Sequence, residues 1–323
     1  MRDGIQYHDM LKLGKSDHKK NILGQGCWTF GGAQWGGAVD SDSIAAMDRA
    51  YELGITHFDT ASGYGSGHSE RLLGQFIRDK RDSIFLASKQ SANKNKEKYA
   101  RSIRTSMENL GTDFIDLYYI HWPKSNIDMR PTMEALVEAK EEGLIGAIGV
   151  SNFSIEHMEM VAEVGPIDAH QLCYNLIWRW DEADIIPYCV AHGIAVVTYS
   201  SIAQGILTGK FPKSPMFGDG DERPNTTLFD PEVWPRVYAS VEEMKVVAAE
   251  ARRPLHHLAI RWVTDRSGVS SVLVGARTAD QVSANVEAMA GEIDERFFDR
   301  LDEISDGLLT LIPDTGNIFR YYP

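Results

Sequence analysis

The chain has 323 residues, of which 43% are hydrophobic, 10% aromatic and 24% charged, and its formal net charge is −13. This composition is typical of a globular protein and excludes a disordered or fibrous chain. Because binding to a phosphate backbone depends on clustered lysine and arginine, the negative charge also disfavours a nucleic-acid partner. A small anionic ligand is still compatible with it, since helix N-termini and backbone amides can hold phosphate groups on an acidic protein.

Cysteine use and hydropathy predict where the protein resides. Cys27, Cys173 and Cys189 lie far apart, without a Cys-x-x-Cys pair or the dense pattern of a secreted disulfide scaffold. The N-terminal region is polar, and no apolar run approaches the ~20 residues that span a bilayer. We therefore expect a reduced, cytoplasmic protein with no membrane partner.

Short apolar or β-branched runs alternate with amphipathic segments, which is typical of a parallel sheet with crossover helices. The expected strands are residues 21–24, 56–59, 83–88, 114–121, 146–150, 169–174, 195–200 and 271–274. The expected helices are residues 43–53, 70–78, 96–110, 133–142, 155–164, 182–192, 237–252 and 279–289. Eight strands with eight crossovers predict an α/β fold, a single (β/α)8 TIM barrel domain over residues 1–323.

Local signals support some of the expected helix ends. Gly54 and Gly143 stand where a glycine is expected just after a helix C-terminus, and Ser154 can open the next helix as its N-cap. Residues 211–235 interrupt the rhythm with five prolines and two glycines. They predict a long loop, at about 204–235, after the seventh strand, for which a functional and a disordered state are both open. Because loops at this end of a barrel border the active site, we favour a mobile lid over a domain linker.

Polar side chains stand at the ends of three consecutive expected strands. Asp59 ends one strand and is followed by Tyr64 between two glycines, Lys89 follows the next strand, and His121 ends the third. In a (β/α)8 barrel the C-terminal ends of the strands meet on one rim, where catalytic residues lie. An acid, a phenol, an amine and an imidazole are therefore expected to converge there.

These four groups can form a proton-transfer site. A tyrosine with a pKa near ~10 is a poor acid at neutral pH without help. Lys89 beside the hydroxyl of Tyr64 would lower the pKa of that phenol, Asp59 would hold the ammonium in place, and His121 would orient a carbonyl oxygen. Singly, the same residues could be a structural ion pair, an exposed turn aromatic and a buried histidine; their joint placement favours catalysis.

The motifs around these residues resemble those of the aldo-keto reductase family. The run 59–65, Asp-Thr-Ala-Ser-Gly-Tyr-Gly, is similar to the family signature, and further similar motifs follow in the family order at 24–28, 116–121, 149–153 and 171–175. The resemblance covers roughly residues 20 to 305. It implies reversible reduction of an aldehyde or ketone, such as a sugar- or polyol-derived carbonyl, with hydride from NADPH or NADH and a proton from Tyr64.

The resemblance also implies a cofactor site across the barrel mouth, with Ser151, Asn152 and Gln171 on the carboxamide and Tyr199 stacked on the nicotinamide. Gly24-x-Gly26 does not continue as a dinucleotide fingerprint, because Thr29 stands where the third glycine is required. We interpret it as a tight turn that places Trp28 over the substrate. No metal is expected, and the residues expected at the cofactor are Gly26, Cys27, Trp28, Asp59, Ser151, Asn152, Gln171, Tyr199, Ser200, Ile202, Gln204, Gly205, Leu207, Lys210, Gly275, Ala276, Arg277, Gln281 and Asn285.

The adenosine end of the cofactor is expected at the last βα unit, where a helix N-terminus favours an anion. Arg277 is expected to pair with a 2′-phosphate, so NADPH is favoured over NADH. This chain departs from many family members, which carry Lys-Ser at the positions of Gly275 and Ala276 and an arginine at that of Gln281.

Aromatic residues are expected around the substrate, with Trp28, Tyr64, His121 and Trp122 as the leading set. Other aromatics that could line the pocket are Trp35, Trp178, Trp180, Phe319, Tyr321 and Tyr322. The expected partner is a small carbonyl or alcohol, and a homo-oligomer is compatible with the sequence.

Two other functions compete with a reductase. The fold that the resemblance implies is shared with potassium-channel β-subunits, so the chain could be a nicotinamide-binding regulatory subunit with slow turnover. Alternatively, Lys89 could form a Schiff base in a barrel aldolase, a role that requires a free amine. The neighbouring Asp59 argues against this second role, because it would keep Lys89 protonated.

Overall fold

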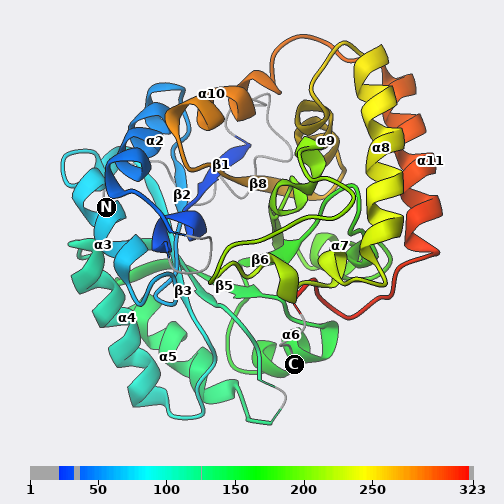
Figure 1. Ribbon diagram of the computed structural model, residues 1–323. Coiled ribbons are helices and arrows are strands. Elements are labelled where there is room, and N and C mark those ends of the chain that lie inside the picture. The colour runs from blue at the N-terminus through cyan, green and yellow to red at the C-terminus, as the bar shows by residue number, and fades with distance from the viewer. Residues whose placement is uncertain (1–21, 33–36, 125, 320–323) are drawn as a thin grey trace.

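The computed structural model describes residues 22–32, 37–124 and 126–319. Its strands form a closed parallel barrel in sequence order, and β1 pairs with both β2 and β8. Figure 1 shows the helices arranged around these strands. The predicted (β/α)8 barrel is confirmed. The strands are β1 (Leu23–Gly26), β2 (His57–Asp59), β3 (Phe85–Gln90), β4 (Ile115–Ile120), β5 (Ile145–Ser151), β6 (Ala169–Cys173), β7 (Ala195–Tyr199) and β8 (Val269–Gly275).

The helical layer closes on itself. Helix α10 packs against α2, which brings the last βα unit beside the first, and α8 and α11 lie side by side (Figure 1). Among the described residues, no helix combines the length and apolar character needed to cross a membrane. The α-helices are α2 (Asp40–Glu52), α3 (His68–Ile77), α4 (Lys96–Leu110), α5 (Arg130–Glu141), α6 (Ile155–Ala162), α7 (Ile185–Ala191), α8 (Trp234–Glu250), α9 (Leu255–Thr264), α10 (Ala279–Glu287) and α11 (Glu295–Leu309).

Helices α9 and α11 were not predicted, although both carry helical signals in the sequence. In α9 the buried residues include Leu255, Leu258, Ala259 and Trp262, which follow the spacing of one helix face. Helix α11 begins after Asp294, whose side chain accepts a hydrogen bond from the backbone N–H of Arg296. The predicted helix ends at Gly54 and Gly143 are confirmed by their positive φ angles of 90° and 73°. The predicted N-cap Ser154 accepts from the backbone N–H of His157.

Strand β1 lies later in the sequence than predicted, so the prediction of a tight turn at Gly24-x-Gly26 was wrong. Both glycines belong to the strand. Gly24 has no side chain because a Cβ there would lie 2.6 Å from the side chain of Leu273 and 2.9 Å from that of His57. The turn comes afterwards, in a short 3-10 helix, η3 (Trp28–Gly31).

The loop after β7 has structure of its own. It contains the 3-10 helices η6 (Ala203–Thr208), η7 (Arg223–Asn225) and η8 (Thr227–Phe229). The rings of Phe211, Phe217, Phe229 and Trp234 pack together at centroid distances of 4.9 to 6.2 Å. The predicted loop at about 204–235 is therefore a folded cover around an aromatic cluster, and its motion as a lid stays a prediction.

The last described residues of the chain are hydrogen-bonded to this loop. Thr226 and Phe319 form an antiparallel bridge, and the backbone N–H of Thr227 donates to the carbonyl oxygen of Ile318 at 2.9 Å. The hydroxyl groups of Thr227 and Thr315 are 3.0 Å apart. The C-terminal segment is thus fixed to the loop after β7, as a short two-stranded strap.

Two glycines allow a close backbone approach between η3 and the turn after β2. A Cβ on Gly31 would lie 2.7 Å from the backbone nitrogen of Gly65 and 2.8 Å from the carbonyl carbon of Tyr64. Gly65 has φ +60° and faces Gly31 in the same way. The position of Tyr64 is therefore set by backbone packing, with no room for a side chain between the two segments.

We predict that Gly31→Ala destabilises the protein by about 1 to 3 kcal/mol, the usual cost of inserting a methyl group into a packed site. Gly63→Ala is the matched control, because a Cβ on Gly63 meets nothing within 4 Å, and we expect it to change stability by less than about 0.5 kcal/mol. Urea unfolding of both variants measures this, and equal stabilities for the two would refute the close approach.

Candidate active site

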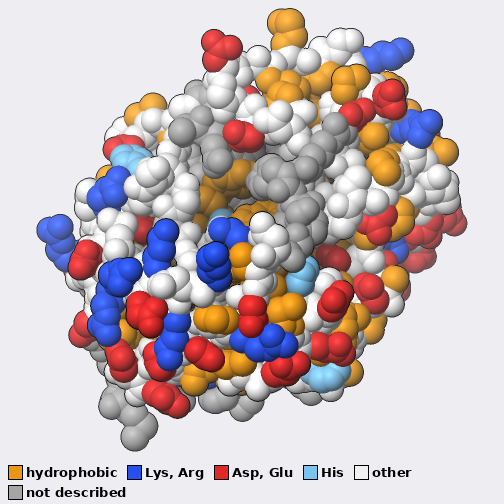
Figure 2. Space-filling model, turned by 90° about the horizontal axis from the view of Figure 1, so that it is seen from below, with side chains coloured by type: hydrophobic (Ala, Val, Ile, Leu, Met, Phe, Trp, Pro, Cys, Tyr) orange, Lys and Arg blue, Asp and Glu red, His pale blue; other side chains and the backbone are white. Residues whose placement is uncertain are grey.

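A pocket of about 810 Å³ lies at the C-terminal ends of the barrel strands. Its walls come from the ends of β1, β2 and β5 to β8 and from loops that follow the strands, including those after β3 and β4. Figure 2 views one face of the molecule, which is hollowed near its centre with hydrophobic side chains at the bottom of the hollow. Acidic and basic side chains are interspersed over this face, so the net charge of −13 does not form one acidic patch there.

A fully buried ion pair lies beside this pocket. The Lys89 ammonium, on β3, contacts Asp59 Oδ1 at the end of β2 and donates to the carbonyl oxygen of Thr60 at 2.8 Å. The other oxygen of Asp59 accepts a hydrogen bond from Gln171 Nε2, on β6, at 2.9 Å. Asp59 and Gln171 line the pocket, whereas Lys89 lies behind them with none of its side chain exposed.

Tyr64 and His121 complete the predicted tetrad on the pocket side of the ion pair. Lys89 Nζ lies 5.3 Å from the ring centroid of Tyr64, and the rings of Tyr64 and His121 are 5.7 Å apart. Burial and the nearby Lys89 ammonium hold the pKa of His121 well below its ordinary value. His121 is therefore neutral at physiological pH, and the four predicted side chains lie together.

Amide and phenol groups are linked at the ends of β5 and β7. Asn152 has a left-handed backbone with φ +61°. Its Oδ1 accepts from the hydroxyl of Tyr199 at 2.6 Å, and its Nδ2 donates to the carbonyl oxygen of His121 at 3.1 Å and to Ser151 Oγ at 3.0 Å. These contacts fix the ring of Tyr199 at the pocket, which Gln171 also lines.

Cationic side chains gather at the opposite end of the pocket. Lys210, Arg223 and Arg277 all line it. Burial lowers the pKa of Lys210, and the guanidinium groups of Arg223 and Arg277 lower it further. Asp221 pairs with Arg223 through Nε at 2.8 Å. Because these cations repel one another, this part of the pocket favours an anionic group.

The backbone between β7 and Lys210 is strained where it meets the pocket. Ser200, Ala203 and Gln204 have φ angles of 53°, 47° and 55°, in a region that residues other than glycine rarely adopt. Such conformations concentrate at functional sites. Gln204 lines the pocket, and its Nε2 is buried with no hydrogen-bond partner among the described residues.

Every residue expected at the cofactor lines this pocket except Leu207. The side chain of Leu207 is fully buried in the hydrophobic core, because the kink at Gln204 and Gly205 turns it inward. Several lining residues were not predicted. Arg223 lies in the loop after β7 and His256 on the missed helix α9, and the others include Thr29, Gly63, Ser91, Ser201, Thr208, Pro254, Leu273 and Ala284.

The four residues expected at the substrate, Trp28, Tyr64, His121 and Trp122, also line the pocket. Phe319 from the strap closes this end, at 5.4 Å from the ring of Trp28, 5.9 Å from Trp122 and 6.4 Å from Tyr199. Trp178 and Trp180 do not line it. The expected aromatics Trp35, Tyr321 and Tyr322 lie outside the described residues.

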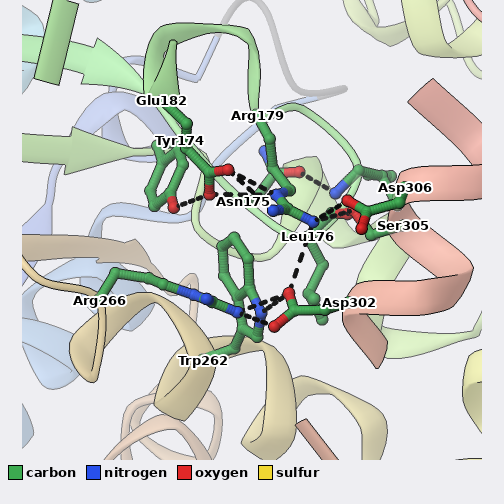
Figure 3. Close-up of polar contacts among 11 residues, drawn as sticks. Tyr174, Asn175, Leu176, Arg179, Glu182, Trp262, Arg266, Asp302, Ser305 and Asp306 are labelled. Carbon is green, nitrogen blue, oxygen red and sulfur yellow. Dashed lines mark hydrogen bonds and ion pairs between the residues drawn. The ribbon is translucent and has the colours of Figure 1, made fainter. Parts of the chain in front are cut away.

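A polar network outside the pocket anchors the loop after β6 (Figure 3). Arg179 pairs with Glu182 at 2.8 Å and with Asp306, on α11, at 2.8 Å. Trp262 on α9 donates to Asp302 on α11 at 2.7 Å. The guanidinium carbons of Arg266 and Arg179 lie 4.0 and 5.3 Å from the centroid of the Trp262 ring. The same loop reaches the pocket, because Asn175 Nδ2 donates to the carbonyl oxygen of Ser200 at 3.0 Å.

Comparison with known proteins identifies the family. The model of the Aldo/keto reductase family matches residues 22–306. The chain is 35% identical over 274 residues to the aldo-keto reductase YhdN of Bacillus subtilis, covering 81% of this chain and 83% of that protein. It is 30% identical to the NADH-specific methylglyoxal reductase of Escherichia coli, covering 86% of this chain and 93% of that protein.

Solved structures agree with the sequence relatives. The glycerol dehydrogenase of Gluconobacter oxydans superposes with a TM-score of 0.81 at 29% identity, covering 91% of this chain and 94% of that one. An aldo-keto reductase of Klebsiella pneumoniae in complex with NADPH gives a TM-score of 0.71 at 26% identity, covering 92% and 94%. The chain therefore belongs to the aldo-keto reductase family of NAD(P)H-dependent oxidoreductases.

Proposed function

We propose that the protein reversibly reduces a small aldehyde or ketone, such as a sugar- or polyol-derived carbonyl, with Tyr64 as the proton donor. The observation that carries this proposal is the buried Lys89–Asp59 pair behind Tyr64, with neutral His121 beside it. Relatives named for methylglyoxal reduction and glycerol oxidation support a small oxygenated substrate.

The residues of the pocket fit a nicotinamide dinucleotide. One end offers the cations Lys210, Arg223 and Arg277 for phosphate groups, and the other offers the amides of Asn152 and Gln171 with the ring of Tyr199. Gln204, between β7 and Lys210 in the chain, has a buried Nε2 with no partner in the part of the chain that the structure describes, and a bound polar group would satisfy it. When bound, the cofactor would supply the hydride that adds to the carbonyl carbon.

The side chains have separate roles in this mechanism. Tyr64 gives its phenolic proton to the carbonyl oxygen as the carbon is reduced, and the Lys89 ammonium stabilises the phenolate that remains. Asp59 holds that ammonium in position. His121, neutral because it is partly desolvated beside a cation, donates a hydrogen bond that orients the carbonyl oxygen. In the direction of alcohol oxidation, the Tyr64 phenolate takes the proton back.

The competing functions predict different contacts or kinetics. A Schiff-base mechanism needs a free, accessible amine, whereas Lys89 is fully buried and paired with Asp59. A regulatory subunit would bind the cofactor and turn over carbonyl substrates very slowly. Measured turnover with simple aldehydes would therefore favour the reductase.

We propose NADPH as the preferred cofactor, on the position of Arg277 just before α10. Thr278 caps this helix by accepting a hydrogen bond from the backbone N–H of Gln281. A guanidinium beside a helix N-terminus suits a 2′-phosphate. The relatives do not agree on this point, since one is named NADH-specific and another was solved with NADPH.

Tyr64→Phe tests the proton donor. We expect kcat for aldehyde reduction to fall by about 10² to 10⁴-fold, the usual contribution of a general acid, while the Kd for NADPH stays within about threefold of its original value. Tyr188→Phe on α7, away from the pocket, is the control and should keep full activity. Steady-state kinetics and fluorescence titration measure both quantities. Retention of most of the activity in Tyr64→Phe would contradict the proposed role.

Arg277→Met tests the cofactor preference. Loss of a hydrogen bond to a charged group weakens binding by about 1.5 to 3 kcal/mol, so the Kd for NADPH should rise about 10- to 100-fold. The Kd for NADH should change little, because NADH has no 2′-phosphate. Arg296→Met, at an exposed position on α11, is the control. Equal weakening of both nucleotides would argue against a 2′-phosphate contact.

A further inference from the structure

The barrel interior beneath the ion pair holds one large aromatic side chain that has no place in the mechanism above. Tyr119 is fully buried on β4 and is the register partner of Lys89 on β3. Its other register partner, on β5, is Gly149, and a Cβ at that position would overlap the Tyr119 ring. Ala147, Ala169 and Ala195 line the same interior. Small residues on β5, β6 and β7 therefore leave the space that the Tyr119 ring fills.

This ring lies next to the charge that the chemistry uses. Lys89 Nζ is 5.8 Å from the ring centroid of Tyr119 and 5.3 Å from that of Tyr64. With Asp59 and the carbonyl oxygen of Thr60, the two rings surround an ammonium that has no exposed surface. A ring face attracts a cation within about 6 Å, and most strongly where water is excluded.

The hydroxyl of Tyr119 does not explain its position. It is buried without a hydrogen-bond partner among the described residues. Burial raises the pKa of this hydroxyl, and the side chain of Gln171, whose Nε2 donates to Asp59, lies close enough to lower that pKa in part. The ring of Tyr119 therefore faces the Lys89 ammonium, while its hydroxyl lies near Gln171 and Asp59.

We propose that Tyr119 is a positioning residue for carbonyl reduction, whose ring forms a dry floor beneath the Lys89 ammonium and directs its field toward Tyr64. The inference rests on the function proposed above. A low-dielectric floor keeps the field of the ammonium unscreened, whereas water in its place would weaken the effect of that charge on the phenol. A void beside an ion pair is polar enough to admit water.

The other titratable groups around the ammonium do not titrate near neutral pH. Burial lowers the pKa of His57 to about 4 and holds that of His121 well below its ordinary value. Burial raises the pKa of Cys27 and of Tyr119, and Asp59 raises both further. None of these groups therefore sets a basic limb of the pH profile near neutral pH.

The test compares Tyr119→Leu, Tyr119→Phe and wild-type protein, with NADPH saturating and D,L-glyceraldehyde as the substrate. For Tyr119→Leu we expect kcat to fall at least about tenfold and the basic limb of kcat/KM to move up by roughly one pH unit, since Tyr64 becomes a weaker acid. For Tyr119→Phe we expect the limb to stay in place and kcat to stay within about threefold.

Tyr118→Leu is the matched control. Tyr118 is an equally buried tyrosine on the same strand, but it points outward and its hydroxyl lies 3.0 Å from Ser106 Oγ. Its loss should lower stability without moving the pH profile. If Tyr119→Leu does not fold, Gly149→Ala tests the same point by displacing the ring, and we expect the limb to move in the same direction.

An unchanged basic limb in Tyr119→Leu, with only the loss of stability seen in Tyr118→Leu, would overturn the inference. A shift of equal size in Tyr119→Phe would also overturn it, because the hydroxyl would then be the functional group. Absence of turnover in the wild-type protein is a different result, since it would refute the proposed function itself.

Discussion

The buried Lys89–Asp59 pair is the constraint on which the rest of the site depends. Two opposite charges that are almost entirely buried must be held in one geometry, because the desolvation of each ion costs several kcal/mol that only close contacts offset. Gln171 supplies one such contact to Asp59, and the carbonyl oxygen of Thr60 supplies one to Lys89. Because these partners come from β2, β3 and β6, the closed barrel itself assembles the pair.

The cationic side chains and the aromatic side chains of the pocket lie at different ends of the barrel mouth. Cations from the loop after β7 and from the turn before α10 face one end, and the rings around Tyr64 face the other. The strap joins these ends, because Arg223 and Thr226 lie in one loop and Thr226 bridges to Phe319. Only a few residues of described chain thus separate Arg223 from the aromatic wall.

The parts that the sequence predicted are those that follow from strand order. Asp59, Lys89 and His121 stand at consecutive strand ends, and parallel strands in a closed barrel bring such ends together whatever the loops do. Arg223, His256 and Phe319 could not be placed in this way, since each reaches the pocket through a loop, a missed helix or a tail whose path depends on tertiary contacts. Leu207 was predicted at the cofactor but does not line the pocket. It lies among residues that line the pocket, but a backbone kink turns its side chain into the core.

The barrel centre and its outer layer divide the tasks of chemistry and stability. Inside the barrel, the apolar cluster is small and consists largely of alanine beside Phe85, Leu117 and Tyr119. The much larger cluster lies between the strands and the helices. Since a buried ion pair gives little net stability, burial of apolar surface in this outer layer must supply most of it. The small residues inside the barrel leave the space that the Lys89 side chain and the Tyr119 ring require. The apolar layer outside the strands provides the stability that offsets the cost of burying the Lys89 charge.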